Sequence, residues 1–268
     1  SGGDQKKYHC DLVINEVKVF GVQKNSSQQK IINNNTLKAP IRKYTFDEYM
    51  GANAYKWTDN KLLAPVVGTV REYSHWFQNG VTNEKDTIAW VNISKYGSFD
   101  KYYKTAAEEY HLDVIPDVHR HVDIELGENK PDFGKDPLDP FSYKMIADYM
   151  FQMAARYGNT KVADSLLHIK AGEPALTGVG WVKYYETWNE PERWWGNPDD
   201  HFSPYEYAAL ASAAYDGHQG KIGSTYGIKQ ADPKSVHIMA GISSLEFDFP
   251  RAVKFWSDYH RNGSLPFD

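Results

Sequence analysis

The sequence contains a single cysteine, Cys10, among 268 residues. One cysteine cannot close an internal disulfide, so the fold must be held by packing, and the redox compartment is left open. The chain also lacks a block of basic residues, and its formal net charge is -5. This charge pattern argues against a nucleic-acid backbone or an anionic membrane as the main partner and suits a neutral ligand better.

Long hydrophobic runs are missing as well. No stretch approaches the roughly 20 apolar residues that a membrane-spanning helix needs, so we expect no membrane span. The chain opens on the polar run Ser1-Gly2-Gly3-Asp4, with no signal peptide before it. Removal of a signal segment and deliberate truncation would both produce such an opening. The first of these predicts a secreted, periplasmic or cell-surface protein.

A glycine-rich phosphate-binding turn is also missing. In a doubly wound sheet such a turn follows the first strand, but Gly51-Ala52-Asn53-Ala54 does not supply one. No other cofactor-specific motif is visible, so we expect no cofactor, and an oxidoreductase is disfavoured.

The chain does contain a regular alternation of strand and helix patterns. Strands are predicted near residues 48–53, 64–73, 113–118, 181–188 and 236–241. Helices are predicted near residues 99–110 and 140–157, from residue 203 and from residue 250. This alternation implies parallel strands joined by right-handed crossovers.

The length and the alternation together predict an α/β fold, a TIM (β/α)8-type barrel over residues 45–268. Residues 1–44 are predicted to form an N-terminal extension with a short β-strand preface. About five strands, with the entrance to a sixth at 265–268, fall short of the eight in a closed barrel. We therefore expect the N-terminal portion of a barrel, completed by a C-terminal segment or by an oligomer.

Two helices carry clear terminal signals. The first has Asp139 as N-cap, Pro140 in its first turn and Gly158 beyond its end. The second opens on Ser203-Pro204-Tyr205-Glu206, a capping box with proline at the first helical position. Four apolar residues at four-residue spacing predict one buried face on the first helix: Phe141, Met145, Tyr149 and Met153.

The most informative stretch is Tyr185-Glu186-Thr187-Trp188-Asn189-Glu190-Pro191, a strand-like run ending in an Asn-Glu pair before a proline. Catalytic side chains of a β/α barrel lie at the C-terminal ends of its strands. Glu190 is therefore predicted to transfer protons, and Asn189 to anchor a substrate.

The run 186–191, followed by Trp194-Trp195, resembles the fourth-strand signature of glycoside hydrolase clan A, the retaining β/α-barrel glycosidases. Val70-Arg71-Glu72-Tyr73 and Gly51-Ala52-Asn53 are similar to the ends of that family's second and first strands. Within the clan the pattern is most like family 39, whose relatives act on xylosides and uronides, although families 5 and 30 are not separated from it. The resemblance runs from about residue 45 to the end.

The resemblance implies that Glu190 is the general acid/base, that Asn189 binds the sugar 2-hydroxyl, and that Arg71 orients the carboxylate nucleophile. A retaining glycosidase needs two carboxyl groups ~5 to 5.5 Å apart, one protonated and one ionised. Partial burial beside Trp188 would favour the protonated form of Glu190 near neutral pH. The family needs no catalytic metal, and none is expected.

The sequence departs from the family pattern at the nucleophile. The family places this glutamate on the seventh strand, with helpful His and Tyr residues after the sixth. Glu246 lies too early to match and fits a loop carboxylate better. The nucleophile is therefore expected beyond Asp268, so hydrolysis is expected of a longer native protein or of this chain with a second one.

Several side chains near strand ends are candidate sugar contacts, because flat rings suit the apolar faces of pyranoses and ring N–H and O–H groups can meet hydroxyls. Alternatives stay open, since large barrels bury many aromatic residues, Asn53 could cap a turn, and Arg71 could pair with Glu72 or Asp117. The predicted substrate-binding residues are Asn53, Trp57, His75, Trp76, His119, His121, Trp194 and Trp195.

The cluster His119-Arg120-His121-Val122-Asp123 has three readings. Two histidines and an aspartate could bind zinc, but alternate residues on an irregular loop need not share one focus. Sugar contacts from the histidines and simple loop packing are the other two.

We therefore expect a retaining glycoside hydrolase that degrades β-linked oligosaccharides or polysaccharides. The alternative is a carbohydrate-binding or catalytically degenerate barrel that keeps the cleft but lacks the nucleophile. Glycan binding without turnover would mark that alternative.

Overall fold

The computed structural model describes residues 50–75, 80–82, 88–90, 93–94, 97–119, 136–193, 201–244 and 247–268. The N-terminal extension over 1–44 and its strand preface lie outside these ranges. The domain boundary near residue 45 therefore stays a prediction.

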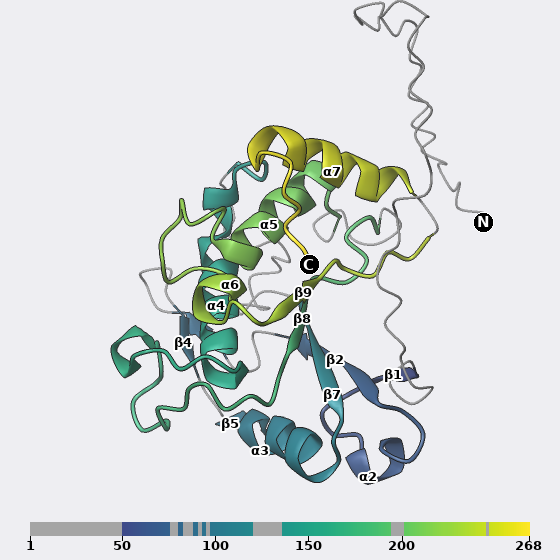
Figure 1. Ribbon diagram of the computed structural model, residues 1–268, viewed down its shortest axis with the longest axis vertical. Helices are drawn as coiled ribbons and strands as arrows, with labels where there is room; N and C mark the ends of the chain where they lie inside the picture. Colours follow the sequence, from purple (N-terminus) through teal and green to yellow (C-terminus); the bar gives the residue numbers. More distant parts are fainter. Residues whose placement is uncertain are drawn as a thin grey trace, which may run out of the picture. The chain divides into compact units, whose positions relative to one another are not determined.

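The described residues contain one five-stranded sheet in which every neighbouring pair is parallel (Figure 1). Its strands, in spatial order, are β1 (Gly51–Ala54), β2 (Thr69–His75), β7 (Asp113–His119), β8 (Tyr184–Thr187) and β9 (Val236–Ile238). Spatial order follows chain order without the reversal that defines a doubly wound sheet. This is the arrangement of consecutive strands in a β/α barrel, and the predicted α/β barrel-type fold is confirmed.

Four short strands between β2 and the next helix were not predicted. β3 (Gly80–Thr82) pairs with β4 (Ile88–Trp90), and β5 (Ile93–Ser94) pairs with β6 (Gly97–Ser98), both antiparallel. They insert two small ribbons into the connection between β2 and β7.

Helices occupy the connections between the strands of the main sheet, and one more follows the last strand. They are α2 (Asn60–Leu63), α3 (Phe99–Lys104), α4 (Lys144–Tyr157), α5 (Pro204–Asp216), α6 (Ile228–Ala231) and α7 (Asp248–His260). A π-helical turn, Thr105–Glu109, continues α3, and 3-10 turns cover Pro140–Tyr143 and Asp164–Leu166. Helix α5 contacts both α4 and α7, and Figure 1 shows these helices together beside the sheet.

The predicted helix starts are confirmed by their hydrogen bonds. The Asp139 carboxylate accepts from the Phe141 N–H at 2.9 Å, ahead of the 3-10 turn that leads into α4. At α5, the Glu206 N–H donates to Ser203 Oγ at 3.3 Å, and the Ser203 N–H donates to the Glu206 carboxylate at 2.6 Å. Helix α7 begins at Asp248, two residues before the predicted Pro250.

The predicted sixth strand does not form at residues 265–268, which have no strand assignment. The Asp268 N–H nevertheless donates to the His237 carbonyl oxygen at 3.0 Å. The His237 N–H in turn donates to Asp268 Oδ2 at 2.9 Å, and His237 Nδ1 lies 2.8 Å from the Pro266 carbonyl oxygen. The segment therefore contacts β9 at His237, without a strand ladder.

Helix α4 is buried on nearly every side, so the prediction of one buried face was too narrow. Every residue from Met145 to Tyr157 is buried, while Phe141, placed on that face, is 40% exposed. The segment 158–183 explains this burial, because it supplies the Leu166 carbonyl to Gln152 Nε2 at 3.1 Å and the Gly178 N–H to the Ala155 carbonyl at 2.9 Å.

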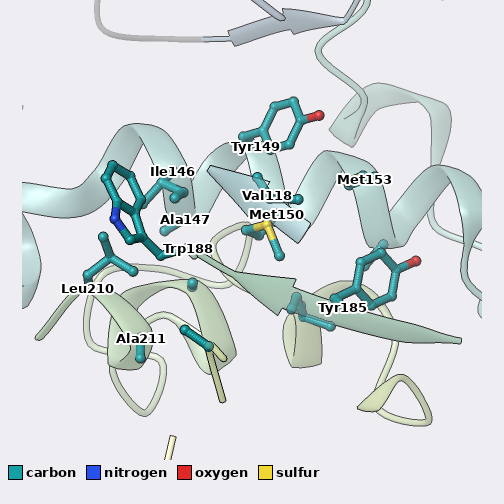
Figure 2. Close-up of a cluster of buried hydrophobic side chains, with 14 of the residues drawn as sticks. Val118, Ile146, Ala147, Tyr149, Met150, Met153, Tyr185, Trp188, Leu210 and Ala211 are labelled. Atoms are coloured by element: carbon teal, nitrogen blue, oxygen red, sulfur yellow. The ribbon is translucent and has the colours of Figure 1, made fainter. Parts of the chain in front are cut away.

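The main hydrophobic core lies between α4, the strands and α5. Figure 2 shows Met150 of α4 near Val118 of β7, and Trp188 near Ile146. Tyr185 of β8 and Leu210 of α5 belong to the same buried cluster. This core fixes β7 and β8 in place, and these two strands carry most of the candidate site.

Candidate active site

Arg71 on β2 gathers polar side chains from two other parts of the sheet. Its Nε donates to Glu186 Oε2 at 2.5 Å, and its Nη2 donates to Glu186 Oε1 at 2.9 Å. The same Nη2 lies 2.9 Å from Asp117 Oδ2 and 3.0 Å from Asn189 Oδ1. One guanidinium thus joins β2, β7 and the end of β8.

Strand register explains why these residues meet. Asp117 pairs with Tyr73 on one side and with Glu186 on the other, and Arg71 lies two residues before Tyr73. Because side chains alternate along a strand, Arg71, Asp117 and Glu186 share one face. Glu72 points to the opposite face, where Tyr103 of α3 donates to its Oε2 at 3.4 Å.

The backbone turns sharply after β8. Trp188 and Glu190 have φ values of 76° and 47°, in the left-handed region that is uncommon for residues other than glycine. The Trp188 N–H donates to the Val118 carbonyl at 2.8 Å, and the Glu190 N–H donates to the Gly241 carbonyl at 2.9 Å. Such conformations persist where surrounding bonds enforce them, and they concentrate at functional sites.

Burial governs the protonation of the carboxyl groups around Arg71. Burial raises the pKa of Asp117 to about 8, with Arg71 opposing this shift and the charge of Glu190 adding to it. Burial also raises the pKa of Glu186, against the stabilising bonds from Arg71. Asp117 Oδ1 has no hydrogen-bond partner within the described part of the chain. The site therefore holds more carboxyl groups than one guanidinium neutralises.

The predicted catalytic residues lie in this site. Arg71 bonds directly to Asn189, and Glu190, half-buried, comes next in the chain. Of the two alternative partners considered for Arg71, Asp117 contacts it and Glu72 faces away. The roles predicted for Glu190, Asn189 and Arg71 in catalysis stay predictions.

Glu186 was assigned no role in the sequence, and Asp117 was named there only as a possible partner of Arg71. Glu186 lies four residues before Glu190 in the same motif, and Asp117 lies near the end of a predicted strand. Their positions near strand ends were a usable signal, because that is where a barrel places its functional groups. The contact of Glu186 with Arg71 required knowledge of the strand order.

A row of rings leads from the surface towards Arg71. Trp57, 63% exposed, stacks on Tyr55 with ring centroids 4.5 Å apart, and Tyr55 lies 5.6 Å from Tyr73. Tyr73 lies 5.1 Å from the Arg71 guanidinium carbon and 5.7 Å from the His119 ring. Tyr55 and Tyr73 join the predicted Trp57 and His119 in a single row.

The structure describes some of the other predicted sugar-binding residues and not others. Asn53 is exposed on β1 and pairs in register with Arg71. His119 is buried, with Nδ1 3.2 Å from Asp117 Oδ2, so it packs against the site. His75 ends β2 in register with His119. Predicted residues outside the described ranges are Trp76, His121, Trp194, Trp195 and Glu246.

Within the described ranges, no three His, Cys, Asp or Glu residues are grouped so that they could hold a metal ion. Of the cluster 119–123, the structure describes His119 alone. No described helix combines the length and apolar character needed to cross a membrane.

No family model and no curated protein matches the chain. Among solved structures, the chain is similar to a family 39 glycoside hydrolase from the gut symbiont Bacteroides cellulosilyticus WH2, at 14% identity and a TM-score of 0.39. The similarity covers 71% of this chain and 31% of that one, so the chain spans about a third of its length.

Proposed function

We propose that the residues around Arg71 form the acid/base half of the catalytic centre of a retaining glycoside hydrolase acting on β-linked glycans. The observation that carries the proposal is the junction of Arg71 with Asn189, Asp117 and Glu186, beside Glu190. Asp117 and Glu186 lie in the carboxyl-terminal halves of β7 and β8, and the Asn-Glu pair follows the carboxyl end of β8. That end of a β/α barrel is where catalytic groups lie. The motif 186–191 resembles the corresponding motif of clan A glycosidases.

Each side chain has a distinct task in this proposal. Glu190 donates a proton to the departing glycosidic oxygen and later removes one from water. Asn189 Oδ1 accepts from Arg71, which directs the hydrogens on Nδ2 towards a sugar hydroxyl. Arg71 holds this arrangement, and a carboxylate nucleophile is expected beyond Asp268.

The aromatic row supplies a surface for the glycan. The exposed rings of Tyr55 and Trp57 have apolar faces suited to sugar rings, with polar atoms at their edges. We assign Trp57, together with Asn53, His75, Trp76, His119, His121, Trp194 and Trp195, to substrate binding.

The test of Glu190 uses the native protein and aryl β-glycosides with good and poor leaving groups. Glu190→Gln is expected to lower kcat/KM about 100-fold or more for poor leaving groups, which need protonation, and far less for activated ones. Glu109→Gln, on an exposed glutamate, is the matched control. Equal losses for both kinds of substrate would count against the assignment.

A carbohydrate-binding or catalytically degenerate barrel is the second candidate. The exposed Tyr55–Trp57 pair favours it, because ring stacking binds a sugar whether or not a bond is cleaved. Calorimetric titration with oligosaccharides, run beside the hydrolysis assay, separates the two. Binding without turnover by the native protein supports the second candidate, and turnover excludes it.

A further inference from the structure

Glu186 receives three hydrogen bonds on its two carboxylate oxygens. Oε2 accepts from Arg71 Nε at 2.5 Å, while Oε1 accepts from Arg71 Nη2 at 2.9 Å and from the Gly241 N–H at 2.7 Å. The residue is 4% exposed, so these bonds form away from bulk water. Charge-assisted bonds of this kind are short, strong and geometrically specific.

Each partner of Glu186 holds one of the proposed functional residues. Arg71 Nη2 also donates to Asn189 Oδ1 at 3.0 Å. The Gly241 carbonyl accepts from the Glu190 N–H at 2.9 Å. Two separate routes therefore lead from one buried carboxylate to the two adjacent residues of the Asn-Glu pair.

The backbone at Glu190 needs such support. Its φ of 47° lies in the left-handed region, which is unfavourable for a residue with a Cβ atom. The bond to Gly241 restrains this turn, and Glu186 holds Gly241 from the other side.

We propose that Glu186 is a positioning residue that sets the orientation of Asn189 through Arg71 and of Glu190 through Gly241. This inference rests on the site assigned under the proposed function. Glu186 does not itself meet the substrate in this scheme; it fixes the two residues that do.

Glu186→Gln is the informative variant. A glutamine side chain offers one acceptor oxygen and one NH2 donor in place of two acceptors. If its NH2 faces Arg71 Nε, one bond is lost; if it faces Gly241 and Arg71 Nη2, two are lost. Either orientation disturbs at least one of the two routes.

Glu72→Gln is the matched control. Glu72 is equally buried and adjoins Arg71 on β2, but it faces Tyr103 on the opposite side of the sheet. It tests whether loss of any buried carboxylate gives the same result.

The first measurement is an NMR spectrum of 15N-labelled full chain. Glu186→Gln is expected to shift the backbone amides of Gly241 and Glu190 and the side-chain amide of Asn189, while Glu72→Gln leaves them in place. Unchanged Glu190 and Asn189 signals in a folded Glu186→Gln variant would overturn the proposal. This measurement needs no turnover, so it decides the inference even if the protein fails to hydrolyse glycosides and the proposed function falls.

A pH titration of the wild type covers the case in which Glu186→Gln does not fold. The charged and titratable groups that face Glu186 are Arg71, Asp117 and Tyr207 of α5, with Glu190 close to Asp117. The chemical shifts of the Gly241 and Glu190 backbone amides are expected to change over the same pH range, with one apparent pKa above the usual range for glutamate. Chemical shifts that change over different pH ranges would refute the proposed coupling of Glu186 to Glu190 through Gly241.

Kinetics provides a further readout where the native protein hydrolyses glycosides. Glu186→Gln is expected to lower kcat/KM for poor leaving groups by up to about 100-fold, as misplaced catalytic groups do. In a Glu190→Gln background the same change is expected to cost much less, because the positioned group is gone. Additive losses would show that Glu186 acts independently of Glu190.

Discussion

Two buried carboxyl groups lie on opposite faces of the sheet, one residue of strand register apart. Glu72 and Asp117 are both less than 2% exposed, and burial raises the pKa of each to about 8. Lys56 opposes this shift at Glu72, and Arg71 opposes it at Asp117. The folded protein therefore retains protons near neutral pH that the unfolded chain releases.

Glu72 and Asp117 stabilise the folded state less as the pH rises from 5 to 7, because each retains a proton in the folded state that the unfolded chain releases. Burial lowers the pKa of His218 and His237 to about 4, and these two histidines act in the opposite direction over the same window. The contribution of Glu72 is therefore measured as the difference between wild type and a variant that lacks this carboxyl group. Glu72→Gln removes one such group. The free energy of unfolding of the variant, relative to that of wild type, should therefore be higher at pH 7 than at pH 5 by on the order of 1–2 kcal/mol. Urea denaturation at both pH values measures this difference.

Glu109→Gln, on an exposed side chain, is the control for that experiment. The window stops at pH 7 because the pKa of Lys56 is lowered to about 8 by its burial, and its proton loss adds an opposite slope above that point. Parallel pH profiles for wild type and Glu72→Gln would contradict the prediction.

The sequence alone identifies the Asn-Glu pair and Arg71 as site residues, but not Glu186. The motif 186–191 marks a strand end, which is enough to select Asn189 and Glu190. Glu186 acquires its role from Gly241, 55 positions away, and from Arg71, 115 positions away. Such partners depend on which strands are neighbours, and a local pattern does not contain that information.

At the scale of elements, the sequence predicted where two helices start, but it did not predict how completely α4 is buried. The capping box at Ser203 and the N-cap at Asp139 are local, and both formed as predicted. The burial of α4 depends on the segment 158–183, which has no periodic pattern to predict its course. The ribbons β3–β6 have two or three residues per strand, too few to show alternation.

The capping box of α5 gives a test at this scale. Ser203→Ala removes the Oγ that accepts from the Glu206 N–H, and it should lower the free energy of unfolding by about 1 kcal/mol. Ser165→Ala, at an exposed serine, should change it far less. Chemical denaturation of both variants gives the comparison, and equal effects would argue that the cap contributes nothing.

At the scale of the whole molecule, the sheet has two outer strands within the described residues, β1 and β9. A groove of about 440 Å³ lies beside β9, lined largely by apolar side chains that include Met239, Phe247, Leu265 and Phe267. Phe247 is 66% exposed and Leu265 is 41% exposed. Exposed apolar surface of this kind favours association.

We expect the chain to associate through this groove, with a further segment or a second copy as its cover. Sedimentation velocity should show association of the wild type that a Phe247→Glu, Leu265→Glu double variant weakens. Tyr259→Glu, at an exposed ring on α7 outside the groove, is the control. A wild type that stays monomeric and binds no hydrophobic dye would contradict this expectation.

The packing of the segment 158–183 against α4 has a consequence for local unfolding. Backbone amides of a helix in the outer layer of a barrel ordinarily exchange with deuterium as soon as that helix frays, but here the bonds from Gln152 to Leu166 and from Gly178 to Ala155 must break first. The middle of α4 should therefore be among the slowest-exchanging parts of the chain. Its exchange rate would then report the detachment of the segment 158–183 rather than the melting of the helix itself.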